Sequence, residues 1–217
     1  MGVFYFPTNF VYWRQVPEHH IFKEKILKFI KEHPNHLRSN GLIKGGKTSF
    51  KNRDVEGFFR GYKEFMKSVI WDTLDEAIRE IDSRENTPET KIKSSFLYQC
   101  WCTTYTKDSI ISFHNHQTVG REILTFDDDK KMLQSFSMLY IINDESDTNY
   151  TEFIQPFSSA VSSHAETTHV FDTSKYKDVG EGTVLVFPSN LYHQVLSMTK
   201  PNRVIFSCDI VSDFHGD

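Results

Sequence analysis

Two stretches near the N-terminus carry apolar residues at every third or fourth position, which is the spacing of one face of an α-helix. The first covers residues 20–32, and His33-Pro34 ends it because the residue before a proline avoids helical backbone angles. The second runs from about Asp54 to Ile81. The expected buried positions are Phe22, Ile26, Phe29 and Ile30 in the first helix, and Phe58, Tyr62, Phe65, Val69 and Ile70 in the second.

From Phe96 onward the apolar period changes to two, as in β-strands with one buried face. Strands are predicted at 96–105, 109–116, 135–143, 150–155, 168–172, 182–188, 192–197 and 202–211. Short strands separated by turn clusters such as Gly180-Glu181-Gly182 are typical of an antiparallel sandwich or jelly roll. Because the helices come first and the strands after, we predict a mainly β fold with flanking helices rather than a parallel βαβ repeat.

The same patterns suggest how the chain is organised. We expect one domain over residues 1–217, made of a helical N-terminal region at 1–95 and a β core at 96–217. The polar segment 35–52 is predicted to be a loop, and the charged segment 83–94 a linker or exposed loop.

Composition excludes several classes of function. The net charge is -4 without a dense Lys/Arg block, so we expect no nucleic-acid partner. No apolar run approaches the roughly 20 residues that cross a bilayer, so we expect no membrane association. Three cysteines without a CxxC pair indicate reduced thiols and a cytoplasmic location. The pattern does not specify an oligomeric state.

Three histidines form the most informative group in the chain. His114 and His116 lie two residues apart in a predicted strand, so both imidazoles point to one face. His193 follows Gly182 and Pro188 at the spacing Gly-x5-Pro-x4-His of the second cupin motif, with Asn190 where that motif has glycine. A third imidazole from a distant strand can close a metal site, although a pair of half-exposed polar strand residues would give the same His-x-His pattern.

Arg203 follows the third histidine by ten residues. On a strand, Arg203 and Ser207 share one face with Ile205, and we expect that face to point into the mouth of the barrel. A buried guanidinium needs an anion, and its planar fork suits a carboxylate. An exposed position at the start of the strand is the alternative for Arg203.

The segment Tyr105-x2-Asp108-x2-Ile111-x2-His114-x-His116 resembles the iron-binding segment of the prolyl 4-hydroxylase-like 2-oxoglutarate/Fe(II) dioxygenases of the cupin superfamily. Residues 181–193 and 201–207 resemble that family's distal-ligand and cosubstrate-anchoring strands. A branch of these oxygenases common in phage and marine bacterial genomes is more similar still, through its His-Asn-His and Phe-Pro-Ser-x3-His motifs and a segment like Phe6-Pro7-Thr8.

This resemblance implies a double-stranded β-helix and assigns roles to residues. Fe(II) would be held by His114, His116 and His193, and 2-oxoglutarate by Arg203, Tyr105 and Ser207. The better-studied relatives carry a carboxylate where this chain has His116, so the site lacks that negative charge. Glu122 is the fallback carboxylate ligand, with a solvated loop acid as its alternative.

A second motif resembles a nucleotide-binding loop. Residues 41–48 fit the phosphate-binding pattern G-x4-G-K-[ST]. That loop works only between a buried strand and a helix N-terminus, and neither neighbouring segment suits such an element. We therefore expect the segment to border the mouth of the active site, with its lysines available to a substrate.

The favoured function is a 2-oxoglutarate- and Fe(II)-dependent oxygenase that hydroxylates a peptide side chain or small molecule and releases succinate and CO2. Two alternatives stay open. One is a cupin-like metal protein that does not use 2-oxoglutarate, such as a three-histidine dioxygenase or an isomerase. The other is a non-catalytic binding module.

Overall fold

The computed structural model describes residues 10–84, 92–116, 124–125, 131–145, 151–154 and 170–214. Glu122 and Phe6-Pro7-Thr8 lie outside these residues, as does most of the segment 83–94. In the described part of the chain, no helix has the length and hydropathy that a bilayer-spanning segment needs.

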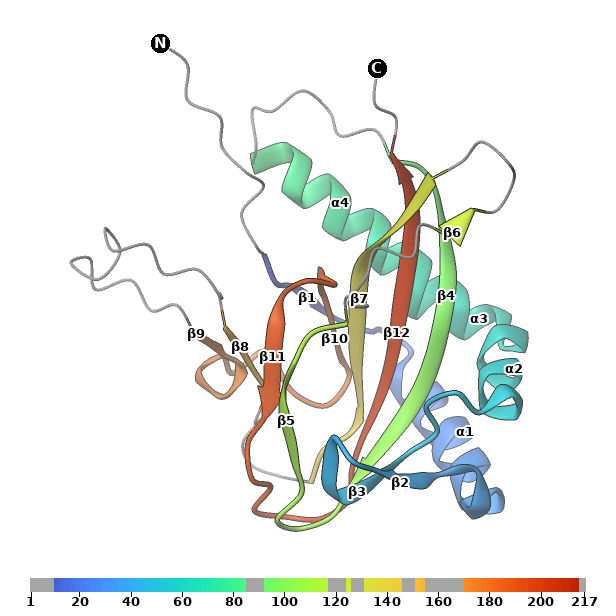
Figure 1. The fold of residues 1–217 in the computed structure, drawn as a ribbon, viewed down its shortest axis with the longest axis vertical. Helices are drawn as coiled ribbons and strands as arrows, with labels where there is room; N and C mark the ends of the chain where they lie inside the picture. Colours follow the sequence, from blue (N-terminus) through green and yellow to red (C-terminus); the bar gives the residue numbers. More distant parts are fainter. Residues whose placement is uncertain are drawn as a thin grey trace, which may run out of the picture.

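An antiparallel sheet curls into a half-barrel and forms the centre of the molecule (Figure 1). Its order is β1-β10-β7-β12-β4-β3-β5-β11-β8-β9, with β2 beside β3 and β6 beside β7. The strands are β1 (Tyr12–Gln15), β2 (Arg38–Asn40), β3 (Ile43–Thr48), β4 (Ile92–Tyr105), β5 (Ile110–His114), β6 (Leu124–Thr125), β7 (Lys131–Asn143), β8 (Thr151–Ile154), β9 (Val170–Asp172), β10 (Thr183–Pro188), β11 (Tyr192–Val195) and β12 (Arg203–Phe214). This confirms the predicted jelly roll.

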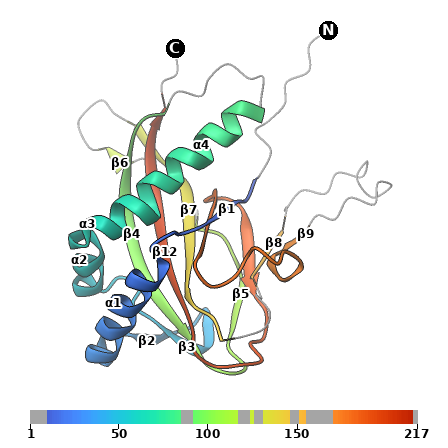
Figure 2. The same cartoon turned by 180° about the vertical axis from the view of Figure 1, so that it is seen from behind.

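Helices cover one face of the sheet, on the side seen in Figure 2. They are α1 (His19–Glu32), α2 (Arg53–Gly61), α3 (Lys63–Phe65), the π-helical η2 (Met66–Trp71) and α4 (Asp72–Arg84), with short 3-10 turns η1 (Pro34–His36) and η4 (Thr173–Lys175). Asn52 is the N-cap of α2, and its side chain accepts hydrogen bonds from the backbone N–H groups of Asp54 and Val55. The predicted single helix over 54–81 is wrong in one respect: it breaks at Tyr62, whose backbone is not helical, directly after Gly61.

Alternate residues of the central strands supply two separate cores. On β12, Val204, Phe206, Cys208 and Ile210 join the helix-side core. Ile205 joins the core inside the half-barrel, as the predicted alternation requires. The Phe206 ring packs at 4.6 Å from that of Phe59 and 5.0 Å from that of Phe65, so this residue ties the helices to the sheet.

The predicted helical region 1–95 also contains strands of the central sheet, which corrects part of the sequence prediction. The predicted boundary between 1–95 and 96–217 stays a prediction. β1 pairs with β10, and β3 pairs with β4 and β5. The segment 41–48 is therefore a strand with a turn before it rather than a loop. At Gly46 an added Cβ would lie 2.8 Å from the Thr104 carbonyl oxygen and 2.6 Å from Ile43 Cγ2. The glycine thus allows β3 to approach β4 closely.

Replacing Phe206 by alanine tests how strongly the helix-side core holds the fold. Phe206 is 0% exposed, and removing such a ring costs about 3–5 kcal/mol of unfolding free energy. Urea denaturation followed by circular dichroism measures the change. Phe96→Ala, on neighbouring β4 with 52% exposure, is the control and should cost less than about 1 kcal/mol. Equal losses for the two variants would contradict this account of the core.

Candidate metal centre

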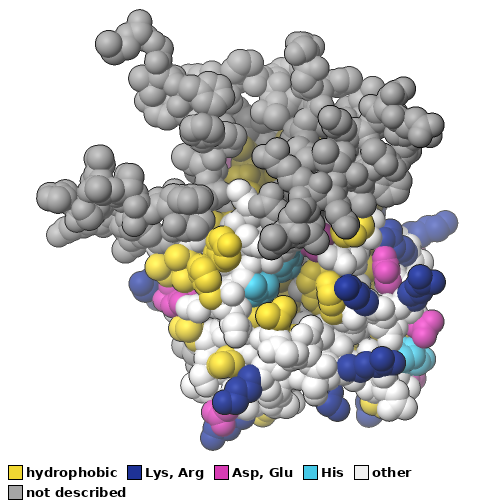
Figure 3. All heavy atoms as spheres, viewed as in Figure 1, with side chains coloured by type: hydrophobic (Ala, Val, Ile, Leu, Met, Phe, Trp, Pro, Cys, Tyr) yellow, Lys and Arg dark blue, Asp and Glu magenta, His cyan; other side chains and the backbone are white. Residues whose placement is uncertain are grey.

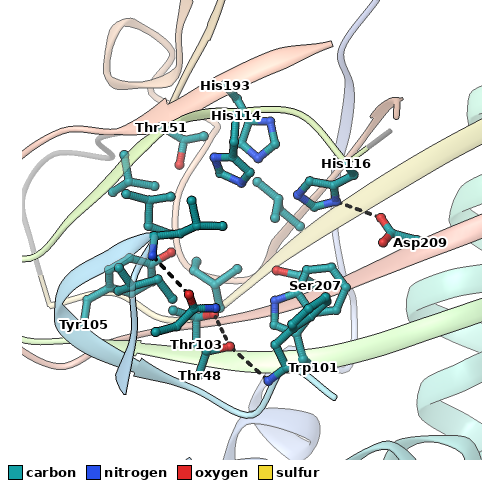
Figure 4. Close-up of a pocket in the computed structure, with 18 of the residues that line it drawn as sticks. Thr48, Trp101, Thr103, Tyr105, His114, His116, Thr151, His193, Ser207 and Asp209 are labelled. Atoms are coloured by element: carbon teal, nitrogen blue, oxygen red, sulfur yellow. Dashed lines mark hydrogen bonds and ion pairs between the residues drawn. The ribbon is translucent and has the colours of Figure 1, made fainter. Parts of the chain in front are cut away.

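The pairing of β5 with β11 brings the three predicted histidines together. His193 is the cross-strand partner of His114, the last residue of β5. His116 follows two residues later, and its backbone N–H donates to the Ser189 carbonyl at 3.0 Å. One nitrogen from each of the three imidazoles lies within 4.8 Å of the others (Figure 4). The structure therefore places the three side chains where they can contact one ion.

Backbone carbonyls orient two of the rings. His114 Nδ1 lies 2.7 Å from the Ser112 carbonyl oxygen, and His193 Nδ1 lies 3.4 Å from that of Leu191. A carbonyl only accepts, so Nδ1 is the protonated nitrogen in each ring and Nε2 carries the lone pair. Such an arrangement is common for histidines that bind metals through Nε2.

Burial keeps these two imidazoles neutral. It lowers the pKa of His114 from 6.5 to about 4, and a protonated His116 nearby acts in the same direction against the opposing Ser112 carbonyl and Asp209. Burial also lowers the pKa of His193 well below its usual value, with His116 and His114 adding to the shift. Neutral imidazoles are the form that coordinates a metal.

The sequence prediction missed Asp209, which contacts the third histidine. Its Oδ1 accepts hydrogen bonds from His116 Nδ1 and Ser137 Oγ, both at 2.7 Å, and its Oδ2 accepts one from Gln99 Nε2 at 2.6 Å. The side chain is 1% exposed. The alternation that points Arg203 and Ser207 inward continues to Asp209, so this signal was available in the sequence.

A pocket of about 260 Å³ opens beside the histidines. The residues that line it include Leu42, Ile43, Thr48, Phe50, Trp101, Tyr105, Thr151 and Val195. Figure 3 shows histidine side chains in a hollow of this face, with hydrophobic side chains beside them. Leu42, Ile43 and Thr48 of the segment 41–48 line this pocket, as expected. Lys44 and Lys47 are exposed and do not line it, and their contact with a substrate stays a prediction.

Arg203 lies behind Tyr105 and Thr151, two residues that line this pocket. It is 1% exposed and opposite Tyr105 in the β12–β4 pairing, which excludes the exposed-strand alternative. Its Nη2 donates to Thr151 Oγ1 at 3.1 Å, and its guanidinium carbon lies 5.6 Å from the centre of the Tyr105 ring. Its Nε is 3.4 Å from Asp144 Oδ2, so a carboxylate of the protein itself already contacts the guanidinium.

Two further residues expected to hold a cosubstrate face the same pocket. Tyr105 and Ser207 both line it and both are buried. Burial raises the pKa of Tyr105 to about 12 against the opposing charge of Arg203. The phenol therefore stays protonated at neutral pH and can donate a hydrogen bond.

Neither a family model nor a curated protein sequence matches this chain. Solved structures do. A prolyl 4-hydroxylase of Pseudomonas putida has a TM-score of 0.52 at 12% identity, over 96% of this chain and 94% of that one. HygX of Streptomyces hygroscopicus, with nickel, 2-oxoglutarate and hygromycin B bound, has a TM-score of 0.57 at 13% identity, over 94% and 83%.

A third similar structure is a prolyl hydroxylase of Trichoplax adhaerens in complex with a hypoxia inducible factor peptide fragment. Its TM-score is 0.50 at 13% identity, over 92% of this chain and 82% of that one. The likeness to a phage and marine bacterial branch stays a prediction. In its described residues, this chain has the double-stranded β-helix fold of the 2-oxoglutarate/Fe(II) oxygenases.

Proposed function

We propose that this chain is a 2-oxoglutarate- and Fe(II)-dependent oxygenase that hydroxylates a peptide side chain or a small molecule. The observation that carries the proposal is one pocket with three converging imidazoles on its wall and, behind its lining residues Thr151 and Tyr105, a buried guanidinium. The similar structures bind a peptide fragment in one case and hygromycin B in another, which supports both substrate classes. The three buried thiols are compatible with the proposed cytoplasmic location.

The histidine group fits a divalent transition metal. Metal–imidazole bonds are about 2.0–2.1 Å long. Nitrogens within 4.8 Å of one another can therefore share an ion after small side-chain rotations. Imidazole ligands suit iron, zinc, nickel and copper alike. We propose His114, His116 and His193 as the ligands, and the fold favours Fe(II) among these metals.

The other end of the pocket fits a dicarboxylate. Thr151 and Tyr105 line it there with a hydroxyl and a phenol, the Arg203 guanidinium lies directly behind them, and Ser207 also lines the pocket. Together, bound Fe(II) and 2-oxoglutarate supply the activation of O2 and the decarboxylation that yields succinate, CO2 and a hydroxylated product. The protein's part is to hold the distal carboxylate at Arg203, to orient the imidazoles through their Nδ1 hydrogen bonds, and to exclude water with the apolar wall.

Two observations favour one alternative, a three-histidine metal enzyme. The third ligand position carries His116 rather than a carboxylate, and Asp144 already contacts Arg203. Both features suit a three-histidine metal enzyme that does not use 2-oxoglutarate. A binding module without turnover is the remaining alternative, and metal content distinguishes it from the other two.

Turnover of the cosubstrate is the direct test. Anaerobic protein loaded with Fe(II) and 2-oxoglutarate should release succinate when air is admitted, up to about one equivalent per iron in the absence of a substrate. Mass spectrometry measures the succinate, and a metal-free sample is the control. Bound iron without any effect of 2-oxoglutarate would favour the three-histidine alternative, and absence of stoichiometric iron would favour the binding module.

Thr151→Val tests the dicarboxylate end of the pocket. The substitution keeps the side-chain volume but removes the hydroxyl that accepts from Arg203. The same hydroxyl is proposed to donate to the ligand carboxylate. Losing a hydrogen bond to a charged group costs about 1.5–3 kcal/mol, so the 2-oxoglutarate Kd should rise roughly 10–100-fold while metal affinity stays unchanged. This variant is cleaner than Arg203→Ala, which would also leave the Asp144 carboxylate buried without its cation.

The matched control is Thr104→Val. Thr104 lies on the same sheet, and its hydroxyl donates to the Lys47 carbonyl outside the pocket. Isothermal titration under anaerobic conditions measures both Kd values. A Thr151→Val protein that binds 2-oxoglutarate as well as the Thr104→Val protein would exclude this end of the pocket as the cosubstrate site.

A further inference from the structure

We propose that Asp209 is the carboxylate of this metal centre, and that it acts through His116 rather than on the metal itself. The inference rests on the proposed metal site and names a positioning residue within it. The negative charge missing from the ligand set is present one hydrogen bond behind the third imidazole.

The hydrogen bonds around Asp209 suit an anion held in a fixed orientation. Oδ1 accepts from His116 Nδ1 and Ser137 Oγ, and Oδ2 accepts from Gln99 Nε2. Ser137 is itself fixed by a 2.9 Å hydrogen bond with Ser189, whose carbonyl accepts the backbone N–H of His116. The ring and the carboxylate therefore belong to one closed network, drawn in part in Figure 4.

This contact determines which nitrogen of His116 meets the metal. A carboxylate accepts, so the proton lies on Nδ1 and the lone pair on Nε2. A carboxylate behind an imidazole also raises the basicity of the ligating nitrogen. Asp209 thereby returns part of the negative charge that three neutral ligands do not supply. It also differs from the partners of the other two rings, which are neutral backbone carbonyls.

The same geometry makes positions 116 and 209 interdependent. An aspartate in place of His116 would bring a second carboxylate against Asp209 inside a buried site. Two carboxylates offer each other only acceptors, so the hydrogen bond that His116 donates to Asp209 would be lost and two negative charges would face each other at short range. The two-histidine, one-carboxylate ligand set is therefore compatible with this chain only if position 209 also loses its charge, for example to asparagine, whose amide can donate.

A four-protein comparison tests the proposal: wild type, D209N, H116D and the H116D/D209N double variant. Anaerobic Co(II) titration with visible absorption reports both affinity and ligand environment. We expect D209N to weaken Co(II) binding roughly 10–100-fold and to shift the absorption bands. H116D should bind more weakly than the double variant, because the second substitution removes the opposed charges.

Asp178→Asn is the matched control. Asp178 accepts a hydrogen bond from Trp13 away from the histidines, so this variant should bind Co(II) as the wild type does. Thermal unfolding of each metal-free protein shows whether the fold is kept. If D209N does not fold, Ser137→Ala removes one hydrogen bond to the same Oδ1 and should weaken binding in the same direction by a smaller factor.

The outcomes separate this inference from the proposed function. D209N with wild-type affinity and an unchanged spectrum, or a double variant no better than H116D, would overturn the role of Asp209 alone. A wild type that binds neither Co(II) nor Fe(II) would overturn the metal site and this inference together. If the wild type binds Co(II) but not 2-oxoglutarate, the proposed role of Asp209 stands and the proposed use of 2-oxoglutarate is overturned.

Discussion

The antiparallel pairing of β11 with β5 is the contact on which the site depends. It sets His193 opposite His114 at the open side of the half-barrel, across a gap of 79 residues in sequence. β11 also pairs with β8, which carries Thr151, the residue that accepts a hydrogen bond from Arg203. Without this strand, the sheet would not bring the histidines and Thr151 to the wall of one pocket.

Two buried carboxylates give the pocket its electrostatic character. Asp144 contacts Arg203, and Asp209 contacts His116. Asp144 lies behind Arg203, the proposed partner of 2-oxoglutarate, and Asp209 lies behind His116, a proposed metal ligand. Neither carboxylate is therefore proposed to contact a ligand directly. Buried charges are expensive unless they are compensated. Asp144 is compensated by the Arg203 guanidinium at 3.4 Å, and Asp209 by hydrogen bonds from His116, Ser137 and Gln99.

Much of the fold and of the histidine group could be predicted from the sequence, because both depend on the spacing of residues within short segments. The period of two gave the central strands within a few residues, and the motif spacing selected three of ten histidines. β3 was not predictable in this way, since its two glycines break the alternation and its pairing with β4 and β5 is with residues over fifty positions away. The break at Tyr62 was also not predictable from helical periodicity, since Tyr62 occupies an apolar position of the stripe and its ring packs against Phe22, Phe58 and Phe65.

Asp144 and Asp209 were harder to recognise for a different reason. An aspartate near a turn, or near the end of a last strand, is most often solvated, and only tertiary contacts show that these two are buried. The face assigned to Arg203 and Ser207 pointed to Asp209, but nothing local indicated that Asp144 would meet Arg203. Which residues support a site is thus less visible in sequence than which residues form it.

The strict alternation along β12 has a consequence for how this protein can change. Ile205, Ser207 and Asp209 line the pocket, and the even-numbered positions from 204 to 210 belong to the helix-side core. Inserting one residue after Arg203 would exchange the two sets, placing Asp209 among the phenylalanines and Phe206 beside the histidines. Insertions and deletions are therefore confined to the ends of this strand, whereas point substitutions at its pocket-facing positions can alter ligand chemistry while the helix-facing residues keep the fold.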